Sequence, residues 1–232
     1  MKILITNDDG IDSEGLAILA RWAAKLGEVT ISAPATQQSG KSHAITLRAP
    51  IEVRETSLGI GEKIAYAVGS TPVDCVRFVN VGLGERYDLV LSGINRGYNL
   101  GEDILYSGTA GAIFEAQLQK MHGLAFSTDH TTFEHAEAAL DTVWQYVVAN
   151  NLLNKNLSYN VNIPPHPKGI LLTRQGGAYF SDRWELYPDG TYQQRGYCVH
   201  ENVHNHELDT DATIDGYITI TPLTVDRSII LK

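Results

Sequence analysis

The strongest constraint on the fold is an alternation of two kinds of segment along the first two-thirds of the chain. Short runs rich in apolar and β-branched residues, such as 2–6, have the composition of a buried parallel strand. Segments with apolar residues at helical spacing, such as 14–26, lie between them. The pattern predicts strands at 2–6, 29–33, 87–92 and 124–127, and helices at 14–26, 72–81, 109–121 and 133–148. Repeated strand–helix units imply an α/β fold in three layers, a parallel sheet with helices on both faces.

The pattern changes after about residue 150. Two strand-like runs on either side of Asp189-Gly190 predict a β-hairpin near 184–197. Further strand-like segments lie at 159–163, 169–173 and 216–221. We therefore divide the chain into an α/β core at 1–150 and a β-rich region at 151–232, and we expect some of the later strands to return to the core sheet.

Composition excludes some classes of partner. The chain of 232 residues has 18 lysines and arginines against 27 aspartates and glutamates, a formal net charge of −9, which argues against a nucleic-acid partner. A small anionic substrate stays open, because a bound divalent cation can reverse the local sign of a site. No apolar run approaches the ~18 residues of a membrane span. The early acidic residues and the two cysteines favour a cytoplasmic protein.

Two adjacent carboxylates follow the first predicted strand, in Asn7-Asp8-Asp9-Gly10. Ligands collect at the carboxyl ends of strands in open α/β sheets. The mutual repulsion of Asp8 and Asp9 would be compensated by a hard divalent cation such as Mg²⁺ or Mn²⁺, which prefers oxygen ligands. The alternative is that these residues only form a turn and cap the next helix.

The loop after the second predicted strand resembles a phosphate-binding loop. Residues 35–42 fit the loose pattern if Ala35 replaces its first glycine, and a phosphate-loop NTPase would use Lys41. The pattern also requires a helix after the lysine, whereas the continuation here is short and ends at Pro50. Two other interpretations stay open: an ordinary polar loop, or a loop that turns the Ser39 hydroxyl toward the two carboxylates.

The third candidate segment follows the strand predicted at 87–92. Asn95 offers a neutral amide oxygen to a metal. Ser107-Gly108-Thr109, at a predicted helix start, offers backbone N–H groups, two hydroxyls and the positive end of the helix dipole, which together suit a phosphate. Simple capping of the helix by Ser107 or Thr109 is the alternative. Elsewhere, we expect a structural role for His43 and a solvated loop around His200, His204 and His206.

The order of these motifs is similar to that of the SurE family, the stationary-phase survival protein E of bacteria and archaea. The resemblance rests first on Asn7-Asp8-Asp9-Gly10, Gln38-Ser39-Gly40, Ser92-Gly93-Ile94-Asn95 and Tyr106-Ser107-Gly108-Thr109. Later in the chain, 159–164 resembles the family's Asn-Val-Asn-x-Pro signature, and 210–223 resembles its C-terminal signature. The resemblance therefore extends over almost the whole chain.

The resemblance implies a Rossmann-like α/β domain with an extended β-hairpin, assembled as a homodimer or homotetramer. It implies a metal-dependent phosphatase acting on nucleoside 5′- and 3′-monophosphates and, in some members, short polyphosphate. The family's metal ligands correspond to Asp8, Asp9, Ser39 and Asn95, and we expect one divalent ion per subunit, Mg²⁺ or Mn²⁺. The predicted catalytic residues are Asp8, Asp9 and Asn95, and the predicted substrate-binding residues are Gly40, Asn99, Ser107, Gly108 and Thr109. A nucleotide-binding regulator without catalysis is the second alternative to this interpretation, beside the NTPase.

Overall fold

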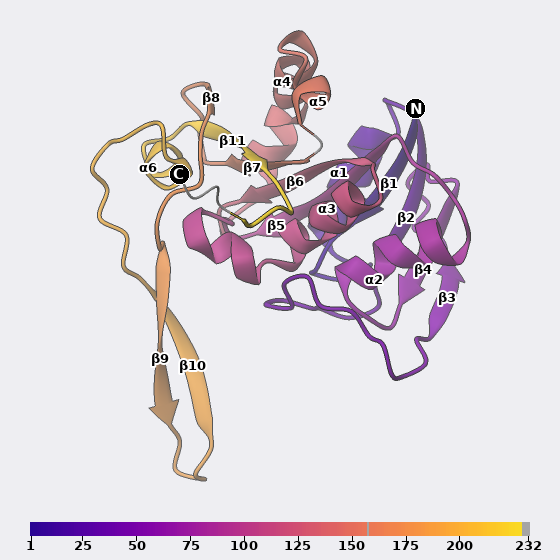
Figure 1. The fold of residues 1–232 in the computed structure, drawn as a ribbon, viewed down its shortest axis with the longest axis horizontal. Coiled ribbons are helices and arrows are strands. Elements are labelled where there is room, and N and C mark those ends of the chain that lie inside the picture. Colours follow the sequence, from indigo (N-terminus) through magenta and orange to yellow (C-terminus); the bar gives the residue numbers. More distant parts are fainter. Residues whose placement is uncertain (157, 229–232) are drawn as a thin grey trace.

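The computed structural model describes residues 1–156 and 158–228 and is built on one large sheet (Figure 1). Its nine strands have the order β3-β4-β2-β1-β5-β6-β7-β11-β8. The strands are β1 (Lys2–Thr6), β2 (Glu28–Pro34), β3 (Val53–Thr56), β4 (Ile64–Val68), β5 (Leu89–Arg96), β6 (His122–Thr128), β7 (Ser158–Ile163), β8 (Ile170–Leu172) and β11 (Ile218–Leu223). The central strands run parallel, so the α/β class predicted from the sequence is confirmed. The sheet is not wholly parallel, because β3 pairs antiparallel with β4 and β11 with β7.

Helices cover both faces of this sheet. They are α1 (Glu14–Ala23), α2 (Pro72–Arg77), α3 (Gly108–Leu118), α4 (Glu134–Ala149), α5 (Leu152–Lys155) and α6 (Asp209–Ile214), with a π-helical turn at Phe78–Gly82 and a 3₁₀ helix at Gly101–Tyr106. Side chains alternate along β1, so Ile3 and Ile5 pack with α1 and α4, whereas Leu4 packs with α2 and α3. This alternation gives the three layers of the fold. Among the described residues, no helix has the length and apolarity that a membrane crossing requires.

Several predicted boundaries differ from the structure. The helix predicted at 72–81 is regular only to Arg77 and continues as the π-helical turn, and the helices predicted to end at 26 and 121 end at Ala23 and Leu118. Strands β3 and β4 were not predicted. Residues Val53–Thr56 form a short, half-exposed edge strand with two charged side chains, which gives no apolar run to recognise.

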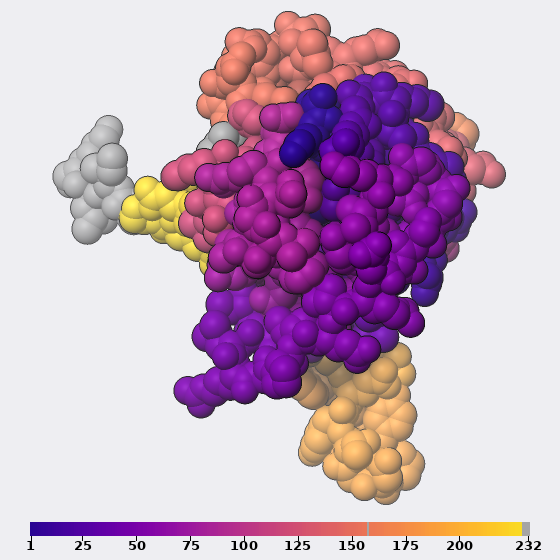
Figure 2. Space-filling view, turned by 90° about the vertical axis from the view of Figure 1, so that its right-hand side faces the viewer, coloured from indigo at the N-terminus to yellow at the C-terminus, as the bar shows by residue number. Residues whose placement is uncertain are grey.

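A two-stranded hairpin projects from this body (Figures 1 and 2). It consists of β9 (Phe180–Leu186) and β10 (Tyr192–Cys198), which pair antiparallel with each other and with no other strand in the described part. The hairpin predicted near 184–197 is therefore present and starts four residues earlier. β7, β8 and β11 lie in the main sheet. The division at residue 150 stays a prediction, and residues 157 and 229–232 of its second region lie outside the described residues.

The three histidines after the hairpin lie in an irregular loop, as predicted, with His204 and His206 exposed and His200 half-buried, but each also contacts a carboxylate. The Nε2 atom of His200 lies 2.8 Å from a carboxylate oxygen of Asp211. His204 and His206 both contact the Oδ2 atom of Asp215, at 2.8 and 2.7 Å. Hydrogen bonds from these two histidines lower the pKa of Asp215. The segment returning from the hairpin is therefore attached to the region of α6 by histidine–carboxylate contacts, a long-range pairing that sequence spacing does not reveal.

Candidate active site

The two carboxylates lie at the carboxyl end of β1, as predicted. Asp8 is buried, and its Oδ1 atom accepts a hydrogen bond of 2.6 Å from the Thr109 hydroxyl. Burial raises the pKa of Asp8 to about 6; the Thr109 hydrogen bond opposes this rise and the charge of Asp9 adds to it. Burial also raises the pKa of Asp9, against hydrogen bonds from the Arg96 backbone and the Gln37 side chain. Both carboxylates are thus held where ionisation is unfavourable without a nearby positive charge.

A tight turn after β1 holds this pair in place. The Asn7 side chain donates to the Gly10 carbonyl at 3.0 Å and to the Ser13 hydroxyl at 2.6 Å. Gly10 has a φ of +104°, a conformation that favours glycine. The cap of α1 is Ser13, whose Oγ accepts from the Leu16 N–H. The turn predicted as an alternative is therefore present, and Asn7 and Ser13, rather than the two aspartates, make its side-chain contacts.

The loop after β2 brings Ser39 toward Asp9. The Gln38 N–H donates to the Asp8 carbonyl at 2.7 Å, which fixes the loop against the first strand end. The Gln37 side-chain nitrogen lies 3.4 Å from Asp9 Oδ1 and 3.0 Å from Ser39 Oγ, so it joins these two groups. Gly40 follows at an exposed position with a φ of +71°. Gln37 was missed by the sequence analysis, because a polar loop residue carries no spacing signal.

Asn95 lies at the same edge of the sheet. β5 pairs parallel with β1, with Ser92 opposite Thr6, and the chain continues past an irregularity between Ser92 and Asn95. The Asn95 side-chain nitrogen donates to the Gly97 carbonyl at 2.7 Å. This bond orients the amide and leaves its oxygen as the atom able to bind a ligand.

The start of α3 completes the site. Ser107 caps the helix, accepting from the Ala110 N–H at 3.0 Å. Gly108 lies directly against Asp8: a Cβ at this position would be 2.9 Å from the Asp8 Cβ and 3.0 Å from its Oδ2. Thr109, fully buried, makes the hydrogen bond to Asp8 described above. Capping by Ser107 leaves a ligand role of this helix start open, because Gly108 and Thr109 lie against Asp8.

Asn99 lies in a different network from the other predicted residues. Its side-chain nitrogen donates to the Ser127 hydroxyl at 2.8 Å, and its backbone N–H donates to Asn162 Oδ1 at 2.9 Å. Its carbonyl accepts from the side chains of Asn160 and Asn162 at 2.8 and 3.0 Å. In the described part of the chain these bonds hold the loop after β5 against β6 and β7. The structure therefore brings Asp8, Asp9, Ser39 and the start of α3 into linked contacts, whereas the hydrogen bonds of Asn99 go to β6 and β7.

The donor atoms available at this site suit a hard cation. Within residues 1–156 and 158–228, no three His, Cys, Asp or Glu side chains are grouped as a metal site. The candidate donors are instead two carboxylates, the Ser39 hydroxyl and the Asn95 amide. An all-oxygen set with two carboxylates fits Mg²⁺ or Mn²⁺ rather than a thiophilic metal. The buried Asp8 and the half-buried Asp9, both with raised pKa values, are the structural feature that such a cation would compensate.

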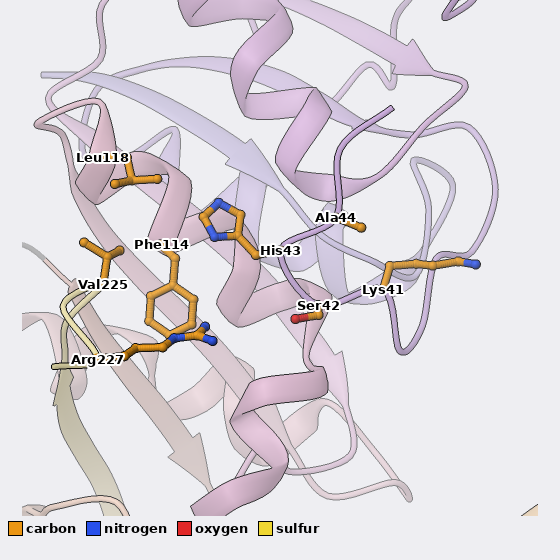
Figure 3. A pocket seen from close by; sticks show the side chains of 8 residues that line it. All are labelled: Lys41, Ser42, His43, Ala44, Phe114, Leu118, Val225 and Arg227. Atoms are coloured by element: carbon orange, nitrogen blue, oxygen red, sulfur yellow. The ribbon is translucent and has the colours of Figure 1, made fainter. Parts of the chain in front are cut away.

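The NTPase alternative lacks its structural context. No helix follows Lys41 before Pro50 in the described chain. Lys41 instead lines a pocket with Ser42 and His43, beside the C-terminal half of α3 (Figure 3). A phosphate-binding loop needs its lysine at the start of a helix, so this geometry counts against the NTPase interpretation.

The fold and site together define an α/β protein with paired carboxylates beside a helix start of the kind that suits an anion, at the carboxyl edge of a parallel sheet. Residues 3–182 match the family described as Survival protein SurE. The chain belongs to the SurE family.

Similar proteins agree with this assignment. The 5′-nucleotidase SurE of Thermosipho melanesiensis is 37% identical over 97% of this chain and 92% of its own length. The 5′-nucleotidase SurE of Desulforudis audaxviator is 38% identical, also over 97% of this chain and 92% of its own length. The crystal structure of the SurE protein from Aquifex aeolicus covers 98% of this chain and 95% of its own, with a TM-score of 0.80 and 32% identity. The predicted family is therefore confirmed.

Proposed function

We propose that this chain is a divalent-metal-dependent 5′-nucleotidase that hydrolyses nucleoside 5′-monophosphates, and also 3′-monophosphates and short polyphosphate. Its membership of a family whose curated relatives are named 5′-nucleotidase SurE makes it an enzyme with nucleotidase activity. The observation that carries the finer proposal is the 2.6 Å hydrogen bond from Thr109 to Asp8. It joins a helix start suited to phosphate with a carboxylate suited to a metal.

Asp8, Asp9, Ser39 and Asn95 would hold one divalent ion, Mg²⁺ or Mn²⁺. When bound, such an ion neutralises the two carboxylates and polarises phosphoryl oxygens. Asp8 is pre-positioned for this role because Thr109 and Gly108 fix it from the side of α3.

The chain's own residues supply the phosphate site. The first N–H groups of α3 have no partners within the helix, and the helix dipole is positive at this end. The Ser107 cap takes the Ala110 N–H, and Gly108 lies directly against Asp8, so the remaining N–H groups and the dipole would stabilise the charge that develops on the equatorial phosphoryl oxygens. Gly108 permits this close approach because it has no side chain. The substrate-binding roles of Gly40 and Asn99 stay predictions.

Phosphate release from a panel of nucleoside 5′- and 3′-monophosphates and tripolyphosphate tests the proposal. We expect release with Mg²⁺ or Mn²⁺, none in EDTA, and recovery when the metal is restored. Binding of monophosphates with no release under any metal would favour the regulator. A strong preference for nucleoside triphosphates would favour the NTPase.

Two neighbouring substitutions separate the nucleotidase from the NTPase. Ser39→Ala should raise the Mn²⁺ concentration needed for half-maximal activity by about tenfold, because it removes one neutral ligand worth about 1.4 kcal/mol. Lys41→Ala should leave hydrolysis largely unchanged. Metal titrations of activity on both variants make the measurement. An inactive Lys41→Ala beside a normal Ser39→Ala would replace our assignment with the NTPase.

We also propose a homodimer or homotetramer with the hairpin in the subunit interface. Large apolar side chains on β9 and β10 are exposed, with Trp184 at 66% and Tyr192 at 62% of full exposure. An isolated two-stranded hairpin is marginally stable in water, and exposed aromatic surface commonly marks a subunit contact. Sedimentation of the full chain and of a chain lacking 184–197 tests this. A monomer at micromolar concentration, or an assembly unaffected by the deletion, would contradict it.

A reducing, cytoplasmic location is the remaining proposal. Cys75 and Cys198 are both free in the structure, and burial raises the pKa of the Cys75 thiol well above its usual range. Neither cysteine therefore supports a structural disulfide. Fractionation of cells expressing the native chain tests the location.

A further inference from the structure

A pocket beside α3 contains the residues of the phosphate-loop-like sequence that the nucleotidase site leaves unused. It has a volume of about 530 Å³, within the ~300–1,000 Å³ typical of small-molecule sites. One wall is residues 41–44, the floor is Phe114 and Leu118 of α3, and the other wall contains Val225 and Arg227. Three segments that are distant in sequence thus enclose it (Figure 3).

Two nitrogen-bearing side chains lie on either side of the Phe114 ring. The Arg227 guanidinium carbon is 6.0 Å from the ring centre, and the His43 ring is 6.3 Å from it, centre to centre. Figure 3 shows His43 and Arg227 flanking Phe114, while Lys41 extends away along the loop. In a chain with a net charge of −9, this concentration of basic side chains at one cavity favours an anionic ligand.

The negative charge behind His43 is already balanced. The Glu115 carboxylate, 3% exposed, accepts from His43 Nε2 at 3.0 Å and from Arg77 Nη1 at 2.9 Å. Burial tends to raise the pKa of Glu115, but hydrogen bonds from His43, Gln119 and Arg77 outweigh it, so the carboxylate is ionised. Glu115 therefore orients the imidazole, and Arg77 compensates its charge. The other ring nitrogen, Nδ1, makes no hydrogen bond to the described residues, and because Nε2–H donates to Glu115, the neutral ring offers Nδ1 as an acceptor to a ligand hydroxyl.

The wall formed by residues 41–44 is held in place by the protein itself. Ser42 donates through its Oγ to the Leu105 carbonyl at 2.6 Å and through its N–H to the Tyr106 carbonyl at 3.0 Å. Gly111 of α3 lies so close that a Cβ there would be 2.2 Å from the Ser42 carbonyl oxygen. A preformed wall reduces the entropy lost on binding.

We propose that this pocket is a second ligand site, separate from the Asp8–Asp9 site, that binds a nucleoside monophosphate. The phosphate contacts Arg227, a nucleoside hydroxyl reaches His43 Nδ1, and the nucleoside covers the apolar surface of Leu118 and Val225. Inorganic phosphate would satisfy only Arg227, and a nucleoside only His43 and the apolar side chains. A nucleotide satisfies both.

Equilibrium dialysis of the full chain with AMP in EDTA tests the proposal, since chelation removes the metal expected at Asp8 and Asp9. We expect Arg227→Gln to weaken AMP binding at least about tenfold, the usual cost of a lost charge-assisted hydrogen bond. Leu118→Glu, which places a negative charge at the half-exposed floor, should weaken it similarly. Arg21→Gln, at an exposed position of α1 on the other face of the sheet, is the matched control and should bind AMP normally.

Several results would overturn the second site. One is AMP binding by Arg227→Gln that equals that of the unaltered chain. Another is binding of adenosine, or of inorganic phosphate, as tight as that of AMP. The third is no binding of AMP in EDTA. A change in sedimentation of Arg227→Gln without a change in AMP binding would show that a second copy of the chain covers the groove. Metal-dependent phosphate release, measured separately, tests the nucleotidase proposal, so the two can fail independently.

Discussion

Asp9→Asn is expected to lower metal-dependent phosphate release by at least about 10³-fold, because a metal contribution of several kcal/mol to the transition state is lost. Asp8→Asn should have the same effect. In each variant one of the two charges that would hold the cation is removed, while the shape of the side chain is kept. Steady-state phosphate release at several Mn²⁺ concentrations measures the loss, and circular dichroism checks that the fold remains. Near-normal activity of Asp9→Asn at limiting Mn²⁺ would contradict a shared metal site.

The Asp8→Asn substitution should stabilise the metal-free chain at neutral pH. The pKa of Asp8 is raised from 3.8 to about 6, so the folded state holds its proton more tightly than the unfolded state. The ionisation of Asp8 therefore does not affect the free energy of unfolding below about pH 4. It lowers that free energy progressively as pH rises from about 4 to 6, and above this range the loss stays at about 3 kcal/mol. The asparagine of the variant would carry no charge and could still accept the Thr109 hydrogen bond.

Urea unfolding in EDTA between pH 4 and pH 8 measures this difference. Asp8→Asn and the unaltered chain should have similar stability at pH 4, and the variant should be more stable at pH 7.5. With saturating Mn²⁺ the order should reverse, because binding to the folded state stabilises only the chain that keeps both carboxylates. A variant that is less stable than the unaltered chain in EDTA at every pH would show that ionised Asp8 is not strained by its burial.

The sequence was sufficient to predict which side chains lie together at the strand ends. Parallel strands place the loops after 2–6 and 87–92 at one edge of the sheet, so the predicted strand directions alone group Asp8, Asp9 and Asn95. The helix start at Ser107 was recognisable because serine, glycine and threonine there match both capping and phosphate binding. Both inferences depend only on local chemistry and on the direction of the chain.

The sequence was insufficient where contacts join distant segments. The Asn160 and Asn162 side chains hold the Asn99 carbonyl, and His204 contacts Asp215, through pairings that no spacing reveals. The pocket beside α3 combines residues near 41–44, 114–118 and 225–227. Neither its existence nor its charge follows from periodicity, because each segment contributes only one wall.

Gly108→Ala is expected to reduce phosphate release by about 10²-fold, the cost of displacing a reacting group by about 1 Å. A methyl group at this position would lie 2.9 Å from the Asp8 Cβ and 3.3 Å from the Pro72 side chain, closer than such atoms normally approach. Because the start of α3 and Asp8 cannot both keep their places, the hydrogen bond from Thr109 to Asp8 should lengthen. Metal affinity, measured from the Mn²⁺ dependence of activity, should fall together with the maximal rate.

Gly177→Ala is the matched control, since a Cβ at Gly177 would meet no atom within 4 Å. This variant should retain normal activity and normal Mn²⁺ dependence, and both variants should unfold cooperatively. A reduced rate in Gly108→Ala with unchanged Mn²⁺ dependence would mean that the added methyl disturbs only the phosphate site. Normal activity in Gly108→Ala would mean that the close contact between α3 and Asp8 is not needed for catalysis, and the link through Thr109 would then lose its role in the proposed mechanism.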